Sequence, residues 1–315
     1  MARIPDGETG IRRLFTTWQF GLFPPEAQPT FGAKPPAEPT QAEIDTVVAN
    51  LKPIETGYDD AAINSYAIFT KLKREGLMIP TAMKFQVSIP SPIDTIICLE
   101  PTYRAALEPA YEDAILRTLV NLQAKIPAHD LAIQFDVAVE LGLIEGFDGA
   151  PWLSPYWEGD QFEGVLKRLL RLVEKVNPEV DLGFHLCYGD IGHKHWMEPK
   201  DTAAMVKLAT ALLEQSPHQV SWIHMPVPKD RDDVEYFEPL TRLDLGETKL
   251  FLGLVHPYDE EGTERRIAAA RRAGVLADFG VATECGMGRT PEGELDEIFR
   301  VAKAVTMPYP QVSKE

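Results

Sequence analysis

Two residues with side chains typical of zinc ligands stand two positions apart in the segment DLGFHLCYGD, residues 181–190. His185 and Cys187 close an apolar run, and residues at i and i+2 of a β-strand project from the same face of a sheet. Cys285 has a similar place in ATECGMGRT, at the end of the last apolar run. Zinc binds imidazole and thiolate, and a catalytic zinc keeps one position open for substrate. These residue types at strand ends predict a zinc site made of His185, Cys187 and Cys285. Two small side chains packed in a core remain the alternative for each residue taken alone.

Short apolar runs separated by helical patterns must bring these residues together. The runs lie at residues 83–89, 131–137, 182–188, 220–225, 249–256 and 278–285. Nearly continuous apolar strands are typical of a parallel sheet that is buried on both faces. With residues 2–8 as a further strand, we predict one α/β domain over residues 1–315, a (β/α)8 TIM-like barrel whose first strand is missing or atypical. A doubly wound sheet is the alternative, but the chain lacks the G-x-G-x-x-G pattern of dinucleotide-binding folds.

Polar side chains gather where the predicted strands end, which favours the barrel. Active sites of (β/α)8 enzymes lie at the carboxyl ends of the strands. The residues found at such positions are Glu8, Asp136, His185, Cys187, His224, His256 and Cys285. The Pro-rich stretch at 24–40 has no period of 2 or 3.6 and is expected to form a loop or surface arm.

Composition narrows the classes of partner. The formal net charge is −17, with 48 acidic and 31 basic residues. This charge argues against nucleic acid and anionic membrane surfaces as partners. No apolar run approaches the roughly 20 residues of a membrane span, and the N-terminus lacks the apolar core of a signal peptide. Three cysteines without disulfide spacing point to the cytoplasm. The sequence leaves the oligomeric state open.

Several of these segments resemble the C-terminal barrel of cobalamin-independent methionine synthases, within the superfamily that also holds uroporphyrinogen decarboxylase. HLCYGD and ATECGMGRT are similar to the two zinc-binding segments of that family. IPDGETGIRR resembles the segment whose glutamate binds the amino group of the thiol substrate, a role that would fall to Glu8. IQFDV resembles the segment with a substrate-binding and catalytic carboxylate, which implies that role for Asp136. GLVHPYDEEGTERRI is similar to the segment with an active-site histidine, so the resemblance gives His256 a proton-handling role.

Three features depart from the family pattern. His224 stands where the family has a glutamate ligand, so it is either a fourth zinc ligand or a hydrogen-bond donor to a leaving group. Glu284, beside Cys285, is a second candidate for the missing carboxylate ligand, although neighbours on a strand face opposite ways. Val137 replaces an acidic residue. The family's first barrel strand and its folate-binding half have no counterpart in this chain, which argues against a polyglutamyl folate as substrate.

Two loops offer further substrate contacts. His193 and His195 follow the strand with the predicted ligands, and they either line the pocket or lie on the surface. Trp152 and Trp157 belong to a long aromatic loop after the Asp136 strand. Such aromatic side chains either stack on a substrate as a lid or pack the loop itself.

The predicted chemistry is zinc-dependent methyl or alkyl transfer that involves a small-molecule thiol and an alkyl donor. Zinc stabilises the thiolate form of a bound thiol near neutral pH, and the thiolate attacks an electrophilic carbon. Zinc-dependent addition of a thiol to an epoxide or activated alkene would use the same site. A metal-free lyase of the decarboxylase type and a non-catalytic zinc-binding barrel are the remaining alternatives.

Overall fold

The computed structural model describes residues 3–5, 14–30, 38–75, 79–146, 153–189, 195–275 and 278–306. Its sheet contains seven strands, each parallel to the next and ordered as in the sequence. They are β1 (Arg3–Pro5), β2 (Lys84–Pro90), β3 (Leu131–Val137), β4 (Asp181–Leu186), β5 (Val220–Pro226), β6 (Lys249–Gly253) and β7 (Phe279–Val281). This order is that of a TIM-like barrel, which confirms the predicted fold class. Among the described residues, no backbone pairing closes the sheet between β7 and β1.

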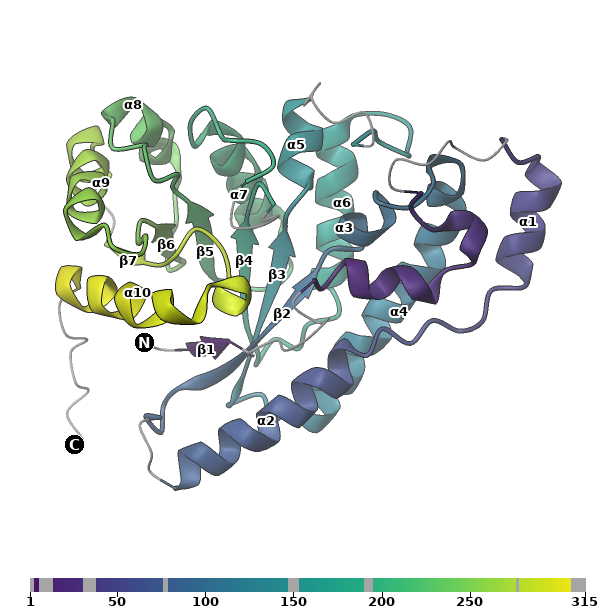
Figure 1. The fold of residues 1–315 in the computed structure, drawn as a ribbon, viewed down its shortest axis with the longest axis horizontal. Helices are drawn as coiled ribbons and strands as arrows, with labels where there is room; N and C mark the ends of the chain where they lie inside the picture. The colour runs from purple at the N-terminus through teal and green to yellow at the C-terminus, as the bar shows by residue number, and fades with distance from the viewer. Residues whose placement is uncertain are drawn as a thin grey trace.

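Helices lie around the sheet (Figure 1). They are α1 (Gln41–Ala49), α2 (Tyr58–Arg74), α3 (Pro92–Ile96), α4 (Arg104–Lys125), α5 (Glu140–Glu145), α6 (Gln161–Val173), α7 (Ala203–Gln215), α8 (Val234–Phe237), α9 (Glu260–Ala273) and α10 (Glu292–Val305). Short 3-10 turns are η2 (Thr17–Leu22), η3 (Pro25–Ala27), η4 (Pro101–Tyr103), η5 (Glu238–Arg242) and η6 (Met287–Arg289). In the part of the chain that the structure describes, no helix has both the length and the apolar character needed to cross a membrane.

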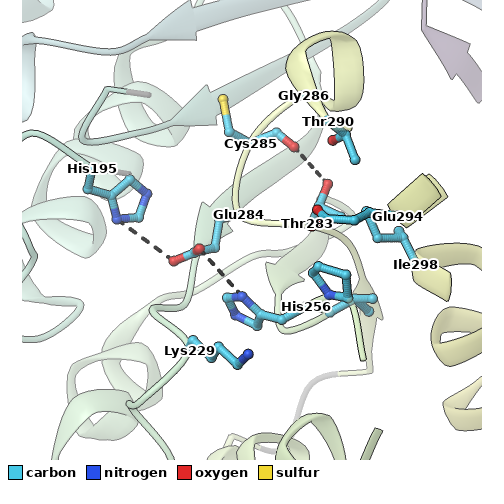
Figure 2. A pocket seen from close by; sticks show the side chains of 12 residues that line it. His195, Lys229, His256, Thr283, Glu284, Cys285, Gly286, Thr290, Glu294 and Ile298 are labelled. Carbon is cyan, nitrogen blue, oxygen red and sulfur yellow. Dashed lines mark hydrogen bonds and ion pairs between the residues drawn. The ribbon is translucent and has the colours of Figure 1, made fainter. Parts of the chain in front are cut away.

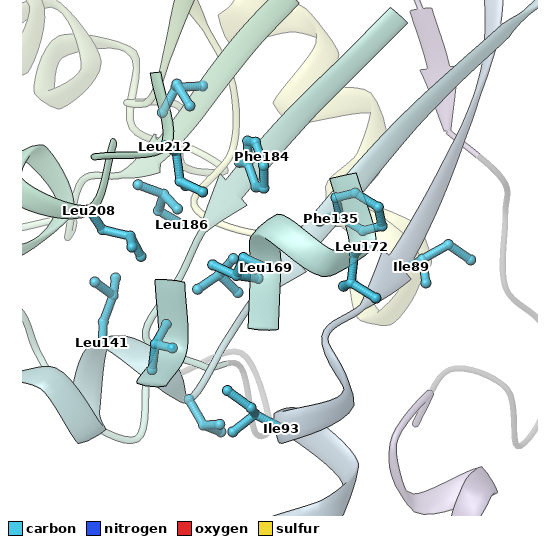
Figure 3. Packing of buried hydrophobic residues seen from close by; sticks show 14 of the residues in the cluster. Ile89, Ile93, Phe135, Leu141, Leu169, Leu172, Phe184, Leu186, Leu208 and Leu212 are labelled. Carbon is cyan, nitrogen blue, oxygen red and sulfur yellow. The ribbon is translucent and has the colours of Figure 1, made fainter. Parts of the chain in front are cut away.

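Side chains along β3 and β4 alternate between an apolar layer under the helices and a polar interior of the barrel. Phe135 of β3 and Phe184 of β4 pack together with their ring centroids 5.9 Å apart. Leu169 and Leu172 of α6 belong to the same buried cluster (Figure 3). Because successive strand residues point to opposite faces, the neighbours of these phenylalanines point the other way. The fold therefore directs Asp136 and His185 away from the helix-covered layer.

Three strands end earlier than their apolar runs predict. β4 ends at Leu186, β6 at Gly253 and β7 at Val281. The backbone continues past these ends in irregular hydrogen bonds, from Val255 N to the Ala282 carbonyl (2.9 Å) and from Cys187 N to the Val137 carbonyl (2.8 Å). Cys187, His256 and Cys285 consequently lie in loops just beyond the strands, where the alternation of a strand no longer fixes side-chain direction.

The Pro-rich stretch is partly built into the core. Phe23, which directly precedes it, and Ala27 in η3 are buried in the main apolar cluster. Gln28 donates through its side chain to the Phe23 carbonyl (2.8 Å). Residues 31–37 of the stretch lie outside the described residues.

Candidate metal centre

His185, Cys187 and Cys285 come together at the carboxyl end of the sheet. One ligand atom from each residue lies within 4.8 Å of the corresponding atoms of the other two. Two thiolates bound to one tetrahedral zinc would lie about 3.8 Å apart, given Zn–S bonds near 2.3 Å. Only 4% of His185 and 1% of Cys187 are exposed to solvent, and Cys285 is half-buried. Their chemistry and proximity fit a zinc ion, and we call these three residues the His–Cys–Cys cluster.

The pKa of Cys187 indicates what a metal ion would change at this site. The neighbouring Cys285 thiol, followed by burial, raises the pKa of the Cys187 thiol well above its usual value. Cys187 is therefore a neutral thiol in the absence of a cation, and metal coordination would deprotonate it.

His224 lies beside the cluster. Its ring stacks on that of His185, with centroids 4.4 Å apart and an interplanar angle of 23°. Its Nε2 lies 2.9 Å from the Thr283 carbonyl, and this nitrogen must carry the hydrogen because a carbonyl only accepts. Burial lowers the pKa of His224 to about 4, so its ring is neutral at pH 7. Among the described residues, the group of close ligand atoms contains neither His224 nor Glu284.

Asp136 is held next to the cluster by a chain of hydrogen bonds inside the barrel. Asp136 pairs in register with His185 on the neighbouring strand. Gln134 donates through Nε2 to Asp136 Oδ1 (2.8 Å), and Trp222 donates through Nε1 to Gln134 Oε1 (3.1 Å). The indole of Trp222 lies over Gly183, where a Cβ atom would approach Trp222 Cε2 to 2.0 Å. The glycine therefore makes the space for the tryptophan that fixes Gln134 and, through it, the Asp136 carboxylate.

A small cavity adjoins Cys285 at the ends of β6 and β7. Its volume is about 210 Å³. The residues that line it are His195, Lys229, Val255, His256, Pro257, Thr283, Glu284, Cys285, Gly286, Thr290, Glu294 and Ile298. Figure 2 shows the Glu284 carboxylate between the rings of His195 and His256, with Cys285 beyond it. Glu284 Oε2 lies 3.6 Å from His256 Nδ1, and Glu284 Oε1 lies 3.8 Å from His195 Nδ1.

His256 has a defined tautomer. Its Nε2 lies 3.1 Å from the Val227 carbonyl and therefore carries the hydrogen, which leaves Nδ1 as the basic atom on the side of Glu284. Burial, together with the charge of Arg266, lowers the pKa of His256 to about 4. At neutral pH the ring is therefore neutral and a weak base, and Nδ1 is available as a hydrogen-bond acceptor.

A buried pair of carboxyl groups lies behind Asp136, and the sequence did not suggest it. Asp94 Oδ1 and Glu140 Oε2 accept from the same backbone N–H, that of Val139, at 3.2 and 3.0 Å. Burial raises the pKa of Glu140 to about 7. Burial and the charges of Glu140 and Asp136 raise the pKa of Asp94 well above its usual value. Both shifts favour the protonated form of these buried acids.

Of the other predicted substrate contacts, Trp157 alone is among the described residues. Glu8, Trp152 and His193 lie outside the described residues. Trp157 packs against α6, where the Arg168 guanidinium lies 4.1 Å from its ring centroid and Gly164 leaves no room for a Cβ atom. Arg168 in turn forms a buried ion pair with Glu108 of α4, with Nη2 and Oε2 2.7 Å apart. Loop packing therefore accounts for Trp157 without a substrate.

Sequence analysis also missed Lys229 and Glu294 in the cavity. Lys229 follows the end of β5 by three residues, and that position at the carboxyl end of a strand was the available signal. Glu294 comes from the first turn of α10, whose placement over the cavity depends on tertiary packing of Ile298 and Val301 against Val255 and Val281. Local pattern alone could not reveal that contact.

Comparison with known proteins relates the chain to methionine synthases through its fold. Neither a protein-family model nor a curated protein sequence matches the chain. A B12-independent methionine synthase from Shewanella sp. W3-18-1, solved in complex with selenomethionine, superposes with a TM-score of 0.53 and 14% identity, over 78% of this chain and 64% of that chain. A putative vitamin-B12 independent methionine synthase from Listeria monocytogenes superposes with a TM-score of 0.50 and 17% identity, over 98% of this chain and 82% of that chain. The chain thus spans less than two thirds of the Shewanella structure, and what it shares with both structures is the TIM-like barrel fold.

Proposed function

We propose that the protein is a zinc-dependent transferase that moves a methyl or other alkyl group to a small thiol. The observation that carries this proposal is the approach of three zinc-type ligand atoms to within 4.8 Å from positions far apart in sequence. When bound to His185, Cys187 and Cys285, zinc would supply the positive charge that keeps a substrate sulfur in its thiolate form. The likeness to methionine synthase structures supports the same chemistry at the level of fold.

Three ligands favour catalysis over storage. Structural zinc sites use four protein ligands, whereas catalytic sites use three and keep one position for water or substrate. His224, one of the two candidates for a fourth ligand, is not among the described residues whose ligand atoms lie within 4.8 Å of one another. Two thiolates and a neutral imidazole also balance the charge of a divalent ion, so the cluster would be neutral before substrate enters.

The surrounding residues would orient the substrates. Asp136, held by Gln134, presents a carboxylate for a cationic or hydrogen-bonding group of the thiol substrate. His256 would accept a hydrogen bond from a substrate group at Nδ1, since Nε2 is committed to the Val227 carbonyl. Glu8 would hold the substrate amino group as the family resemblance implies.

Cobalt substitution tests the proposal directly. Co²⁺ in a site with two thiolates gives absorption bands that change when another thiolate binds. We expect titration with small thiols to change these bands in the wild type. A cobalt form that no thiol alters would contradict the transferase. Cys285→Ser should lose the bands, whereas Cys98→Ser, a change just after the end of α3, should keep them because Cys98 is not part of the His–Cys–Cys cluster.

A further inference from the structure

His224 links the neighbourhood of His185 to the loop that carries Cys285. It is the register partner of His185 on the adjacent strand β5, and the two rings stack with their centroids 4.4 Å apart. Its Nε2 donates a hydrogen bond to the Thr283 carbonyl across 2.9 Å, because a carbonyl oxygen can only accept. One side chain therefore contacts the ring of one candidate ligand and the backbone two residues before another.

The hydrogen bond from His224 reaches the loop between its start and Cys285. At the start, the Ala282 carbonyl accepts from Val255 N across 2.9 Å. Farther along, the Thr283 hydroxyl donates to the Cys285 carbonyl across 2.7 Å (Figure 2). Thr283 therefore receives a hydrogen bond from His224 through its carbonyl and passes the constraint to Cys285 through its hydroxyl.

Gly253 at the end of β6 lets the same loop lie close against the sheet. A Cβ atom at position 253 would come within 2.8 Å of Glu284 Cα and 2.9 Å of the Thr283 carbonyl oxygen. Both are backbone atoms, so a side chain at this position would have to displace the loop itself. The carbonyl that accepts from His224 is thus held between Gly253 of β6 and the imidazole of β5.

The position of Cys285 decides whether the three ligand atoms can bind one metal ion. Its ligand atom lies within 4.8 Å of those of His185 and Cys187. Cys285 follows the end of β7, so regular strand pairing does not fix its place. Residues that hold metal ligands in position commonly change metal affinity by about 10- to 100-fold when they are replaced. Contacts that hold this loop are therefore expected to control the affinity of the site.

We propose that His224 is a positioning residue of the metal centre, which holds the Cys285 loop and the His185 ring in place without binding the metal ion. Among the described residues, the group of close ligand atoms does not contain His224, and its Nε2 is engaged by the Thr283 carbonyl. This inference rests on the zinc centre of the proposed function. It gives a role to the histidine that stands where the family resemblance would place a glutamate ligand.

Asparagine and glutamine at position 224 separate positioning from ligation. The amide nitrogen of glutamine lies as many bonds from the backbone as histidine Nε2, so His224→Gln can still donate to the Thr283 carbonyl. The asparagine side chain is one bond too short. Zinc affinity, measured by competition with a chromophoric chelator, should fall by about 10- to 100-fold in His224→Asn and by less than about fivefold in His224→Gln. The spectrum at saturating Co²⁺ should match that of wild type in both variants, because no ligand is lost.

A change on β6 displaces the same loop without altering His224. Gly253→Ala should weaken zinc binding by about tenfold, because the added methyl group pushes against the backbone of residues 283 and 284. Gly293→Ala on α10, where nothing lies within 4 Å of the added Cβ atom, is the matched control and should bind zinc as tightly as wild type. Urea midpoints of the metal-free proteins establish that each variant is folded.

Two outcomes would overturn the inference. One is an equal loss of zinc affinity in His224→Asn and His224→Gln, and an altered cobalt spectrum would then identify His224 as a ligand. The other is wild-type zinc affinity in His224→Asn.

Titration of the cobalt-loaded wild type with thiols separates this inference from the transferase. If thiols change the bands but His224→Asn binds zinc normally, the positioning role fails and the transferase stands. If His224→Asn loses affinity that His224→Gln retains, but no thiol changes the bands, the positioning role stands and the transferase fails.

Discussion

The close packing of Gly183 and Trp222 yields a prediction about the stability of the protein. The two residues are register partners on β4 and β5, and a Cβ atom at 183 would lie 2.0 Å from Trp222 Cε2 and 2.1 Å from Cδ2. Trp222 is only 3% exposed, and its rigid indole cannot move aside easily. Overpacking of this kind costs about 1–3 kcal/mol. Displacement of the indole also breaks its hydrogen bond to Gln134, worth about 1 kcal/mol.

Gly183→Ala should therefore lower the free energy of unfolding by roughly 2–4 kcal/mol, measured from urea midpoints. The cost should fall below about 1 kcal/mol when the same change is made in a Trp222→Leu protein, because the smaller side chain leaves room for the methyl group. Gly293→Ala on α10, where nothing lies within 4 Å of the added Cβ, is the matched control and should not destabilise. Equal midpoints for wild type and Gly183→Ala would refute the packing described here.

Two further predictions concern buried charges. The pKa of Glu140 is raised from 4.5 to about 7, so the folded state binds the proton of this carboxyl group more tightly than the unfolded state does. As pH rises from 4.5 to 8, the free energy of unfolding of wild type should fall by roughly 3 kcal/mol relative to that of Glu140→Gln. Parallel curves of unfolding free energy against pH for the two proteins would contradict this. Glu108→Gln should destabilise by about 3 kcal/mol, because it leaves the buried Arg168 guanidinium without its carboxylate. Exposed Glu264→Gln is the control, and an unchanged urea midpoint in Glu108→Gln would show that the ion pair contributes little.

Much of the fold follows from the sequence because parallel strands buried on both faces are nearly continuous apolar runs. The run at 131–137 matches β3 residue for residue, and all seven expected strands are present. The ends of β4, β6 and β7 are less predictable, since regular strand pairing gives way there to irregular backbone hydrogen bonds. Apolar character continues past that point and gives no signal of the change.

The residues around the candidate site were only partly predictable for the same reason. His185 and Cys187 were related by strand spacing, and Cys285 by its position after an apolar run. The alternation rule, however, misjudged Glu284: it lies beyond the end of β7, and both Glu284 and Cys285 line one cavity. The role of His195 in that wall and the pairing of Asp94 with Glu140 depend on contacts between distant segments, which local spacing does not encode.

Metal analysis of the purified protein, prepared without chelators, measures zinc binding itself. Wild type and Cys98→Ser should hold about one zinc per chain, and Cys187→Ser and Cys285→Ser almost none. A wild-type protein that retains less than about 0.3 zinc per chain and takes up none on dialysis against zinc would contradict the proposed zinc site.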